Sequence, residues 1–252
     1  MRRVLLFIFA LLLAACGRNG LERLAPGEVG RVVEVTSGDS LTLDTGLQVR
    51  LAGIEAPWGD EPFAAEARAG LARLAEGKRV QLLYGGARRS KYGRALAQVK
   101  LTQGDLWLEQ ALLRRGLARV RTWADNRAMA PALLEDEAYA RNRGLGLWRL
   151  PRYRVLLPRE TEGAPGFQIV EGRVRRTTPG DDAVSLEFMD GAGERFTAAI
   201  DPKAIGDFET VGKAPGQLVG EPVRLRGPIR YGPDGPVMRL DHPEQVELLK
   251  GG

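Results

Sequence analysis

The chain has 252 residues and a formal charge of +5, from 37 lysines and arginines against 32 aspartates and glutamates. Such an excess of cations suits an anionic partner, either nucleic acid or a lipid surface, and the alternative is a soluble protein with a few spare arginines. One histidine, His242, and one cysteine, Cys16, are too few for a zinc site of Cys/His type or an internal disulfide. We expect His242 to be a surface turn residue, so any hydrolytic centre must rely on carboxylates, arginines and a hard metal ion.

Residues 1–15 are typical of a bacterial export signal. Two arginines follow the first residue, and residues 4–15 are almost wholly apolar. This run is shorter than the roughly 20 residues of a membrane-spanning helix and suits the apolar core of a signal peptide. It ends in Leu-Ala-Ala-Cys, which resembles the lipobox of bacterial lipoproteins and implies cleavage before Cys16 and acylation of its thiol. An ordinary signal peptide followed by an incidental cysteine is the alternative.

The residue after the cysteine, Gly17, bears on the final location of the protein. In Gram-negative lipoproteins, a residue other than aspartate at this position implies sorting to the outer membrane, where the protein faces the periplasm. Residues 16–27 are polar and interrupted by glycine and proline. We therefore expect a tether between the lipid and the first domain.

Residues 28–150 alternate short strands with helices and are expected to form the first domain. The predicted strands cover residues 29–36, 40–43, 47–54, 79–84, 95–100 and 117–122, and the predicted helices cover residues 61–76, 106–115 and 130–143. Apolar stripes with helical spacing indicate the helices, and β-branched or alternating runs bounded by turn residues indicate the strands. This arrangement is typical of a small barrel of the OB type, whose open face binds oligonucleotides in many proteins.

Five motifs within this domain add a specific resemblance. They are Ser37-Gly38-Asp39-Ser40, the run RLAGIEAP at residues 50–57, Lys91-Tyr92-Gly93-Arg94, residues 112–120, and the run GLGLW at residues 144–148. In this order and at these spacings they resemble the staphylococcal-nuclease-like domains, or thermonucleases, over residues 28–150. The resemblance implies a β-rich α+β fold, an OB barrel with three helices, and a calcium-dependent phosphodiesterase that acts on DNA and RNA.

Two arginines in these motifs, Arg50 and Arg94, match by position the family's catalytic arginines. Hydrolysis of a phosphodiester builds negative charge on the phosphorus oxygens, and fixed cations there lower the barrier. The planar guanidinium group stays charged at any working pH and binds two phosphate oxygens at once. The alternative for each residue is a strand-end arginine that pairs with a surface acid.

The resemblance also implies a calcium site, since calcium takes six to eight oxygen ligands. Asp39 matches one metal-binding aspartate of the family, and Glu55 stands where the other is. Ala56 replaces a threonine that lends its main-chain oxygen, so this ligand need not be lost. Ser37 replaces a further aspartate, and we therefore expect weaker calcium binding than in the family. The alternative for Asp39 is a turn residue that accepts main-chain hydrogen bonds.

Trp58 is a departure from the family pattern. The family has a glutamate after the proline of this motif, which activates or orients the attacking water. Indole has one N–H donor and no acceptor, so Trp58 cannot take a proton from water. Loss of a general base costs about 10²- to 10⁴-fold in rate. Asp60 and Glu61 are candidates to reach back from the following loop and act in its place.

The stretch that contains the second arginine motif is rich in cations. Arg88, Arg89 and Lys91 surround Tyr92, whose ring offers a face on which a base can stack. We expect these residues to contact nucleic acid.

Residues 151–165 are expected to link the first domain to a second one at residues 166–252. Predicted strands at 168–175, 183–189 and 195–200 are followed by a helical connection at 202–218 and by strands at 222–231 and 236–240. Three strands, a helical connection and two more strands predict a second small OB-like barrel. It contains no evident acid–base pair or metal cluster, so we expect it to bind a ligand or to pack against the first domain.

Three functions are consistent with these features. The first is an exported, lipid-anchored nuclease of the staphylococcal type that uses calcium to cleave DNA or RNA. The second is the same barrel with catalysis lost at Trp58, which holds nucleic acid or a protein partner at the cell envelope. A structural role in the envelope is a third, and the sequence identifies no particular protein partner.

Overall fold

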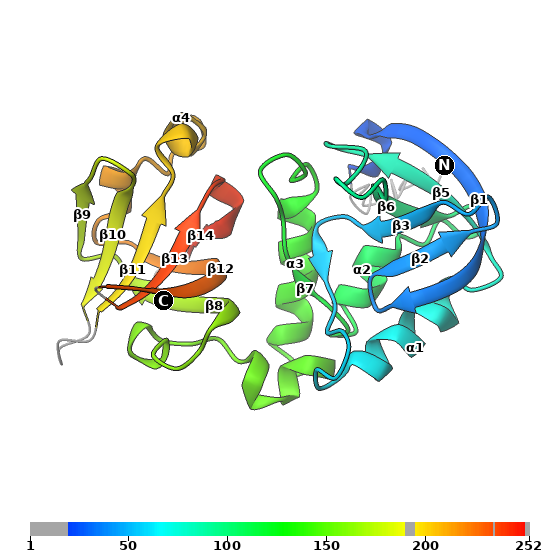
Figure 1. Ribbon diagram of the computed structural model, residues 1–252, viewed down its shortest axis with the longest axis horizontal. Helices are drawn as coiled ribbons and strands as arrows, with labels where there is room; N and C mark the ends of the chain where they lie inside the picture. Colours follow the sequence, from blue (N-terminus) through cyan, green and yellow to red (C-terminus); the bar gives the residue numbers. More distant parts are fainter. Residues whose placement is uncertain (1–19, 190–194, 234, 250–252) are drawn as a thin grey trace, which may run out of the picture.

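The computed structural model describes residues 20–189, 195–233 and 235–249. The predicted signal and the predicted lipidation site, Cys16, lie outside the described residues. Two β-rich units lie on opposite sides of helix α3 (Ala130–Arg141), the first from the N-terminal half of the chain and the second from the C-terminal half (Figure 1). Each unit has its own cluster of buried apolar side chains. No helix of the described part is long and apolar enough to cross a membrane.

Five strands close the first barrel in the order β1-β2-β3-β6-β5. They are β1 (Ala25–Ser37), β2 (Ser40–Leu43), β3 (Gln48–Leu51), β5 (Arg79–Tyr84) and β6 (Ala95–Leu101). The other elements of this unit are β4 (Ile54–Glu55), which pairs with β7 (Arg119–Val120), and the helices α1 (Ala64–Ala75) and α2 (Leu108–Leu113). Together with α3, these elements confirm the predicted OB barrel with three helices.

Strand β1 closes the first barrel because it belongs to both of its edges. The N-terminal part of β1 pairs with β5 and the C-terminal part with β2. The register shifts between Pro26 and Val29 and again between Val32 and Glu34. Such irregularities bend a strand and increase its twist, so one strand of 13 residues can turn the corner that closure requires.

Two glycines set the turns around the first barrel's open end. A Cβ on Gly38, between β1 and β2, would lie 2.6 Å from the Cβ atoms of Ala56 and Ala67, so only glycine lets this turn pack so closely. Gly53 has a φ of +79°, which a side chain rarely tolerates. The turn at Gly53 divides the predicted strand at residues 47–54 into β3 and β4.

The second unit is built on a seven-stranded sheet. Its strands are β8 (Gly166–Arg173), β9 (Arg176–Pro179), β10 (Val184–Met189), β11 (Arg195–Ile200), β12 (Pro222–Gly232), β13 (Gly235–Leu240) and β14 (Val246–Leu248). The pairings run β9-β10-β11-β13-β12-β8, and only residues 174–175 separate β8 from β9 in the chain. Strands β11 and β13 are parallel, as β3 and β6 are in the first barrel. This order agrees with the predicted OB-like barrel.

The structure differs from the prediction in the shorter elements. The predicted strand at residues 168–175 ends at Arg173, and β9 and β14 were not predicted because they are too short for a recognisable alternation. Helix α4 (Ile205–Thr210) is the regular part of the predicted helical connection. Short 3-10 helices cover Leu21–Arg23, Gly146–Arg149, Pro151–Tyr153, Pro158–Glu160, Pro202–Ala204, Pro215–Leu218 and Pro243–Gln245.

The connection at residues 151–165 is packed against both units. The hydroxyl of buried Tyr153 donates to the main-chain oxygen of Pro62, at 2.7 Å. The N–H of Leu156, also buried, donates to the main-chain oxygen of Ile169 in β8, at 2.9 Å. The predicted linker is therefore part of the contact between the two barrels.

His242 corrects a prediction, because it is buried and not a surface residue. Its side chain is 1% exposed, and its Nε2 lies 2.7 Å from the hydroxyl of Thr122, which follows β7 in the first unit. Its Nδ1 lies 2.5 Å from a carboxylate oxygen of Asp241. The turn that carries His242 is covered by the first unit, and a local sequence pattern does not encode such a contact.

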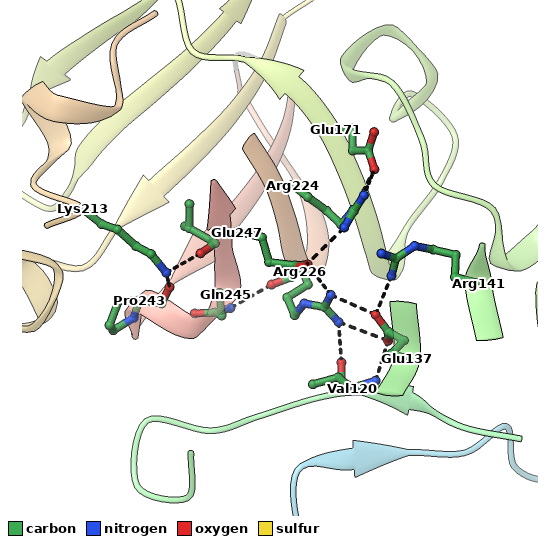
Figure 2. Close-up of polar contacts among 11 residues, drawn as sticks. Val120, Glu137, Arg141, Glu171, Lys213, Arg224, Arg226, Pro243, Gln245 and Glu247 are labelled. Carbon is green, nitrogen blue, oxygen red and sulfur yellow. Dashed lines mark hydrogen bonds and ion pairs between the residues drawn. The ribbon is translucent and has the colours of Figure 1, made fainter. Parts of the chain in front are cut away.

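Arg226 connects the two barrels through buried polar contacts (Figure 2). From β12, its guanidinium group donates to both carboxylate oxygens of Glu137 on α3, at 3.2 and 3.0 Å, and to the main-chain oxygen of Val120, at 3.2 Å. Burial raises the pKa of Glu137, but attraction to Arg226 and Arg141 and the hydrogen bonds they donate outweigh it, so the pKa lies below its ordinary value of 4.5. Glu137 is therefore a carboxylate at neutral pH, held between α3 and β12.

Candidate active site

A cleft of about 360 Å³ opens on the first barrel beside the turn between β1 and β2. We call it the first cleft. It is lined by Thr36, Ser37, Asp39, Ser40, Leu41, Gln48, Val49, Arg50, Glu55, Ala56, Trp58 and Arg94. All but Arg94 come from residues 36–58, so the structure brings the predicted arginines, the predicted calcium ligands and the tryptophan to one place.

The two arginines reach the first cleft from neighbouring strands. Arg50 lies in β3, and Arg94 directly precedes β6, which pairs with β3 in parallel through Val49 and Ala95. Arg50 forms an ion pair with Asp39, at 3.0 Å. Arg94 has no ion pair or side-chain hydrogen bond with another residue in the described part of the chain. One guanidinium group is thus held by an acid, and the other is available for an anion.

Asp39 holds the turn of the first cleft in place. Its Oδ1 accepts hydrogen bonds from the hydroxyls of Ser37 and Ser40, at 2.9 and 3.1 Å. Its Oδ2 accepts the N–H of Ala56 at 2.9 Å and pairs with Arg50. The carboxylate is almost wholly buried. In this arrangement Asp39 accepts a main-chain hydrogen bond, the alternative to metal binding, and its position also fixes Arg50.

Glu55 is paired with arginines that the sequence motifs did not single out. It lies in β4, and the neighbouring strand β7 and the residue after it supply Arg119 and Arg121. Glu55 forms an ion pair with Arg121, and its other oxygen lies 3.8 Å from Arg119. Burial lowers the pKa of the Arg119 guanidinium, and the charge of Glu55 opposes this shift. The alternation Arg-Val-Arg was the available signal that these two side chains share one face of a strand.

A calcium ion needs more oxygen ligands than the first cleft offers. Its two carboxylates, Asp39 and Glu55, are already neutralised by arginines. Among residues 20–189, 195–233 and 235–249, no three acidic, histidine or cysteine side chains are grouped so that they could hold a metal ion. The unpaired guanidinium of Arg94 would repel a cation. The residues present therefore do not fit a calcium centre, and we derive no chemical step from one.

Trp58 lies at the rim of the first cleft with 69% of its surface exposed. Glu61, one of its candidate substitutes, turns back so that its Oε2 accepts a hydrogen bond from the main-chain N–H of Trp58, at 3.1 Å. The other oxygen of Glu61 lies 3.4 Å from Arg152. Asp60, the second candidate, is exposed; neither it nor Glu61 lines the first cleft, but Glu61 lines the neighbouring hollow that also contains Trp58. Of the two carboxylates, Glu61 is thus the one held beside Trp58.

The predicted nucleic-acid contacts at Arg88, Arg89, Lys91 and Tyr92 do not line the first cleft. Arg89 pairs with Glu28 and donates to the hydroxyl of Tyr84, at 2.7 Å. The Arg88 guanidinium lies 5.1 Å from the centre of the Tyr84 ring, and the Lys91 ammonium lies 5.0 Å from that of Tyr92. Tyr92 itself is 74% exposed, so its ring is accessible to a ligand beyond the cleft.

Comparison with known proteins places this site in a family. The model of the family described as staphylococcal nuclease homologue matches residues 48–150, which begin at β3 and end beyond α3. A protein of Haemophilus influenzae, described as an uncharacterized endonuclease, is 32% identical over 149 residues, which are 57% of this chain and 75% of the relative. With its closed five-stranded barrel, the chain belongs to the staphylococcal nuclease homologue family.

Proposed function

We propose that the protein binds the phosphodiester backbone of nucleic acid in the first cleft, through the guanidinium groups of Arg50 and Arg94. The observation that carries the proposal is the position of Arg94, which shares the cleft with Arg50 and has no acid partner in the described part of the chain. A guanidinium group in this state keeps its paired donors for two phosphate oxygens. Membership of a nuclease family supports nucleic acid as the source of the phosphate.

This mode of binding does not depend on a metal ion. An entering phosphate meets Arg94 first and competes with Asp39 for Arg50, because both anions use the same guanidinium donors. The carboxylate of Asp39 keeps its hydrogen bonds from Ser37, Ser40 and Ala56 when Arg50 turns to the ligand. The turn therefore keeps its shape during binding.

The test is the affinity of the full chain, in detergent, for a fluorescent single-stranded oligonucleotide. Replacing Arg50 and Arg94 together by alanine should weaken binding about 100-fold or more, since each charged hydrogen-bonding group contributes about 1.5–3 kcal/mol. The matched control replaces Arg73 and Arg79, two exposed arginines outside the first cleft. Equal weakening in both double variants would mean that net charge, and not the cleft, binds the strand. A chelator should leave the affinity unchanged.

Hydrolysis of the bound strand is a second candidate function, and the position of Glu61 favours it. Its carboxylate lies next to Trp58, the residue at the family's base position, and offers the acceptor that indole lacks. Glu61→Ala should abolish strand cleavage by the protein, whereas Asp60→Ala should not. If both variants cleave as the unmodified protein does, neither carboxylate replaces the base.

We also propose that the protein is exported and anchored by a lipid on Cys16. The proposal rests on the arrangement of two arginines, an apolar run and the Leu-Ala-Ala-Cys sequence at residues 1–16. The glycine after Cys16 supports an outer-membrane location facing the periplasm. An anchored protein of this kind would meet nucleic acid outside the cytoplasm.

A further inference from the structure

A second cleft, of about 210 Å³, adjoins the first one and lies between the two barrels. The two clefts share Glu55 and Trp58 in their walls. The first unit and the connection contribute Glu61, Arg119, Arg121, Arg152 and Tyr153 to the second cleft, and residues 165–168, at the start of β8, form the opposite wall. The second barrel thus extends the wall of the candidate site.

A third, smaller hollow of about 110 Å³ continues the second cleft along the contact between the barrels. The second cleft and the third hollow share Arg121 and Phe167 in their walls. The third hollow reaches Trp123 of the first unit and Arg239 of the second. Because each hollow shares lining residues with the next, the three are neighbours in a row that starts at the first cleft. We call the second and third hollows together the interbarrel groove.

Aromatic rings and guanidinium groups alternate along the interbarrel groove. Arg119 lies 5.0 Å from the ring centre of Tyr153 and 4.9 Å from that of Phe167. Arg121 lies 5.4 Å from the ring centre of Phe167 and 4.7 Å from that of Trp123. Each contact is within the range of a cation–π interaction. These planar groups are held in place before any ligand arrives, which lowers the entropy lost on binding.

Two tryptophans at the groove are unusually exposed. Trp58 is 69% exposed where the first cleft meets the groove, and Trp123 is 51% exposed at the far hollow. Arg152, which lines the second cleft with Trp58, has a side chain that is 59% exposed, and its ion pair with Glu61 is long, at 3.4 Å. Sites for single-stranded nucleic acid combine exposed aromatic faces, on which bases stack, with cations that contact the phosphates.

We propose that the interbarrel groove binds the single strand that continues from the first cleft, with bases stacked on Trp58 and Trp123 and a phosphate at Arg152. The second barrel then acts as the wall that extends the strand-binding site beyond the arginine pair. A single strand fits this chemistry because its bases can leave their neighbours and stack on side chains, whereas the bases of a duplex are stacked on one another. This inference rests on the proposed binding of phosphates at Arg50 and Arg94.

The experiment compares the affinity of the full chain, in detergent, for thymidine oligonucleotides from a dinucleotide to a dodecanucleotide, without divalent metal. A dinucleotide is short enough to occupy the first cleft only. The gain in affinity with oligonucleotide length therefore measures how much the groove contributes to binding. Trp123→Ala and Arg152→Ala should each leave the dinucleotide affinity unchanged and weaken dodecanucleotide binding about tenfold. Trp123→Phe keeps an aromatic face and should retain most of the affinity.

The salt dependence of binding distinguishes a phosphate contact, proposed for Arg152, from base stacking, proposed for Trp123. Arg152→Ala removes one phosphate contact and should reduce the slope of log affinity against log salt by about 0.7, whereas Trp123→Ala should leave the slope unchanged. Arg73→Ala is the control for lost charge, since Arg73 is exposed on α1 and lines none of the three hollows.

Several outcomes would overturn the inference. In one outcome, both groove variants bind the dodecanucleotide as the unmodified protein does, while replacement of Arg50 and Arg94 still abolishes binding. This result would rule out binding in the groove but support the proposed function. Failure of the unmodified protein to bind any oligonucleotide would remove both. Equal losses for the dinucleotide and the dodecanucleotide would mean that the variants disturb the first cleft. A duplex bound as tightly, with the same losses, would contradict stacking of single-stranded bases.

Discussion

Trp58 occupies the rim that the first cleft shares with the interbarrel groove, and its main-chain N–H donates a hydrogen bond to the carboxylate of Glu61. The two acids inside the cleft, Asp39 and Glu55, hold arginines in position. At the scale of single residues, the cleft therefore offers donors for an anion and few free acceptors for a proton. This balance is the reason why we propose phosphate binding ahead of hydrolysis.

Trp58→Glu should convert the first cleft into a better catalyst, because it restores an acceptor at the family's base position. Strand cleavage should increase by about 10²-fold or more. The measurement is the rate of release of a fluorescent fragment from a labelled strand, with added calcium and with chelator. Trp58→Gln, which has the same shape but no basic carboxylate, is the matched control. If the two variants cleave at the same rate, Trp58 does not stand at a base position.

Glu109 should make the protein less stable as the pH rises. Complete burial raises its pKa well above the ordinary value of 4.5, against the hydrogen bonds it accepts from the N–H of Val99. At pH values between the ordinary pKa and the raised pKa, the folded state keeps a proton on Glu109 that the unfolded state has lost. The free energy of unfolding therefore falls as the pH rises through this interval. Glu109→Gln should therefore gain stability relative to the unmodified protein as the pH rises above 4.5 in urea denaturation. Glu135→Gln, at an exposed site, should show no such trend.

At the scale of elements, α3 and β7 serve both the candidate site and the contact between the barrels. β7 directs Arg119 towards Glu55, while the N–H and the carbonyl of Val120 bond to Glu137 and Arg226. The edge of this short strand is thus covered by side chains from α3 and β12, which satisfies backbone groups that would otherwise be buried without partners. The position of Arg119 and Arg121 depends on this arrangement.

Glu137→Ala should cost about 3–5 kcal/mol of unfolding free energy, because it leaves the buried guanidinium of Arg226 without its main partner. Since the folded-state pKa of Glu137 is lowered, its contribution is complete above pH 4.5 and is lost as the pH falls through the folded-state pKa. Urea denaturation at neutral and acid pH measures both effects. Glu135→Ala, on the exposed side of the same helix, should change stability by less than about 0.5 kcal/mol. If Glu137→Ala also changed the free energy of unfolding by less than about 0.5 kcal/mol, the ion pair between Glu137 and Arg226 would not stabilise the fold.

At the scale of the whole molecule, two barrels with separate apolar cores meet through polar contacts. Arg226 binds Glu137, His242 lies against Thr122, and Arg127 pairs with acids of the second unit. Polar contacts of this kind have defined directions, and they hold the second barrel so that the start of β8 lines the interbarrel groove. The relative position of the barrels therefore decides whether an interbarrel groove exists.

The full chain should enter the detergent phase when a bacterial membrane extract is partitioned, because an acylated Cys16 adds buried hydrocarbon at the N-terminus. Cys16→Ser removes the thiol that would be acylated and should move the protein to the aqueous phase or leave the signal uncleaved. Mass spectrometry of the N-terminal peptide distinguishes these results. A serine variant that partitions and is processed as the unmodified protein does would contradict lipid anchoring.

Local patterns in the sequence were sufficient for the first barrel and for the place of its cleft. Alternating residues and the Ser-Gly-Asp turn predicted the strands, because strand period and turn chemistry act over a few residues. The common site of Arg50 and Arg94 was predicted from the resemblance of their motifs to a nuclease family. The second barrel's order was also predictable from its strand rhythm. The extents of β9 and β14 were not, since each is set by the strands that pair with it.

Only the tertiary structure decided which partners these residues have. Glu55 and Arg121 are 66 positions apart in the chain, and Thr122 and His242 are 120 apart, so no local pattern relates them. Folding brings these segments together and turns a predicted metal ligand into an ion-pair partner and a predicted surface histidine into a buried one. The sequence by itself determined the barrel and its arginines; packing between distant segments decided the charge of the first cleft and created the groove beside it.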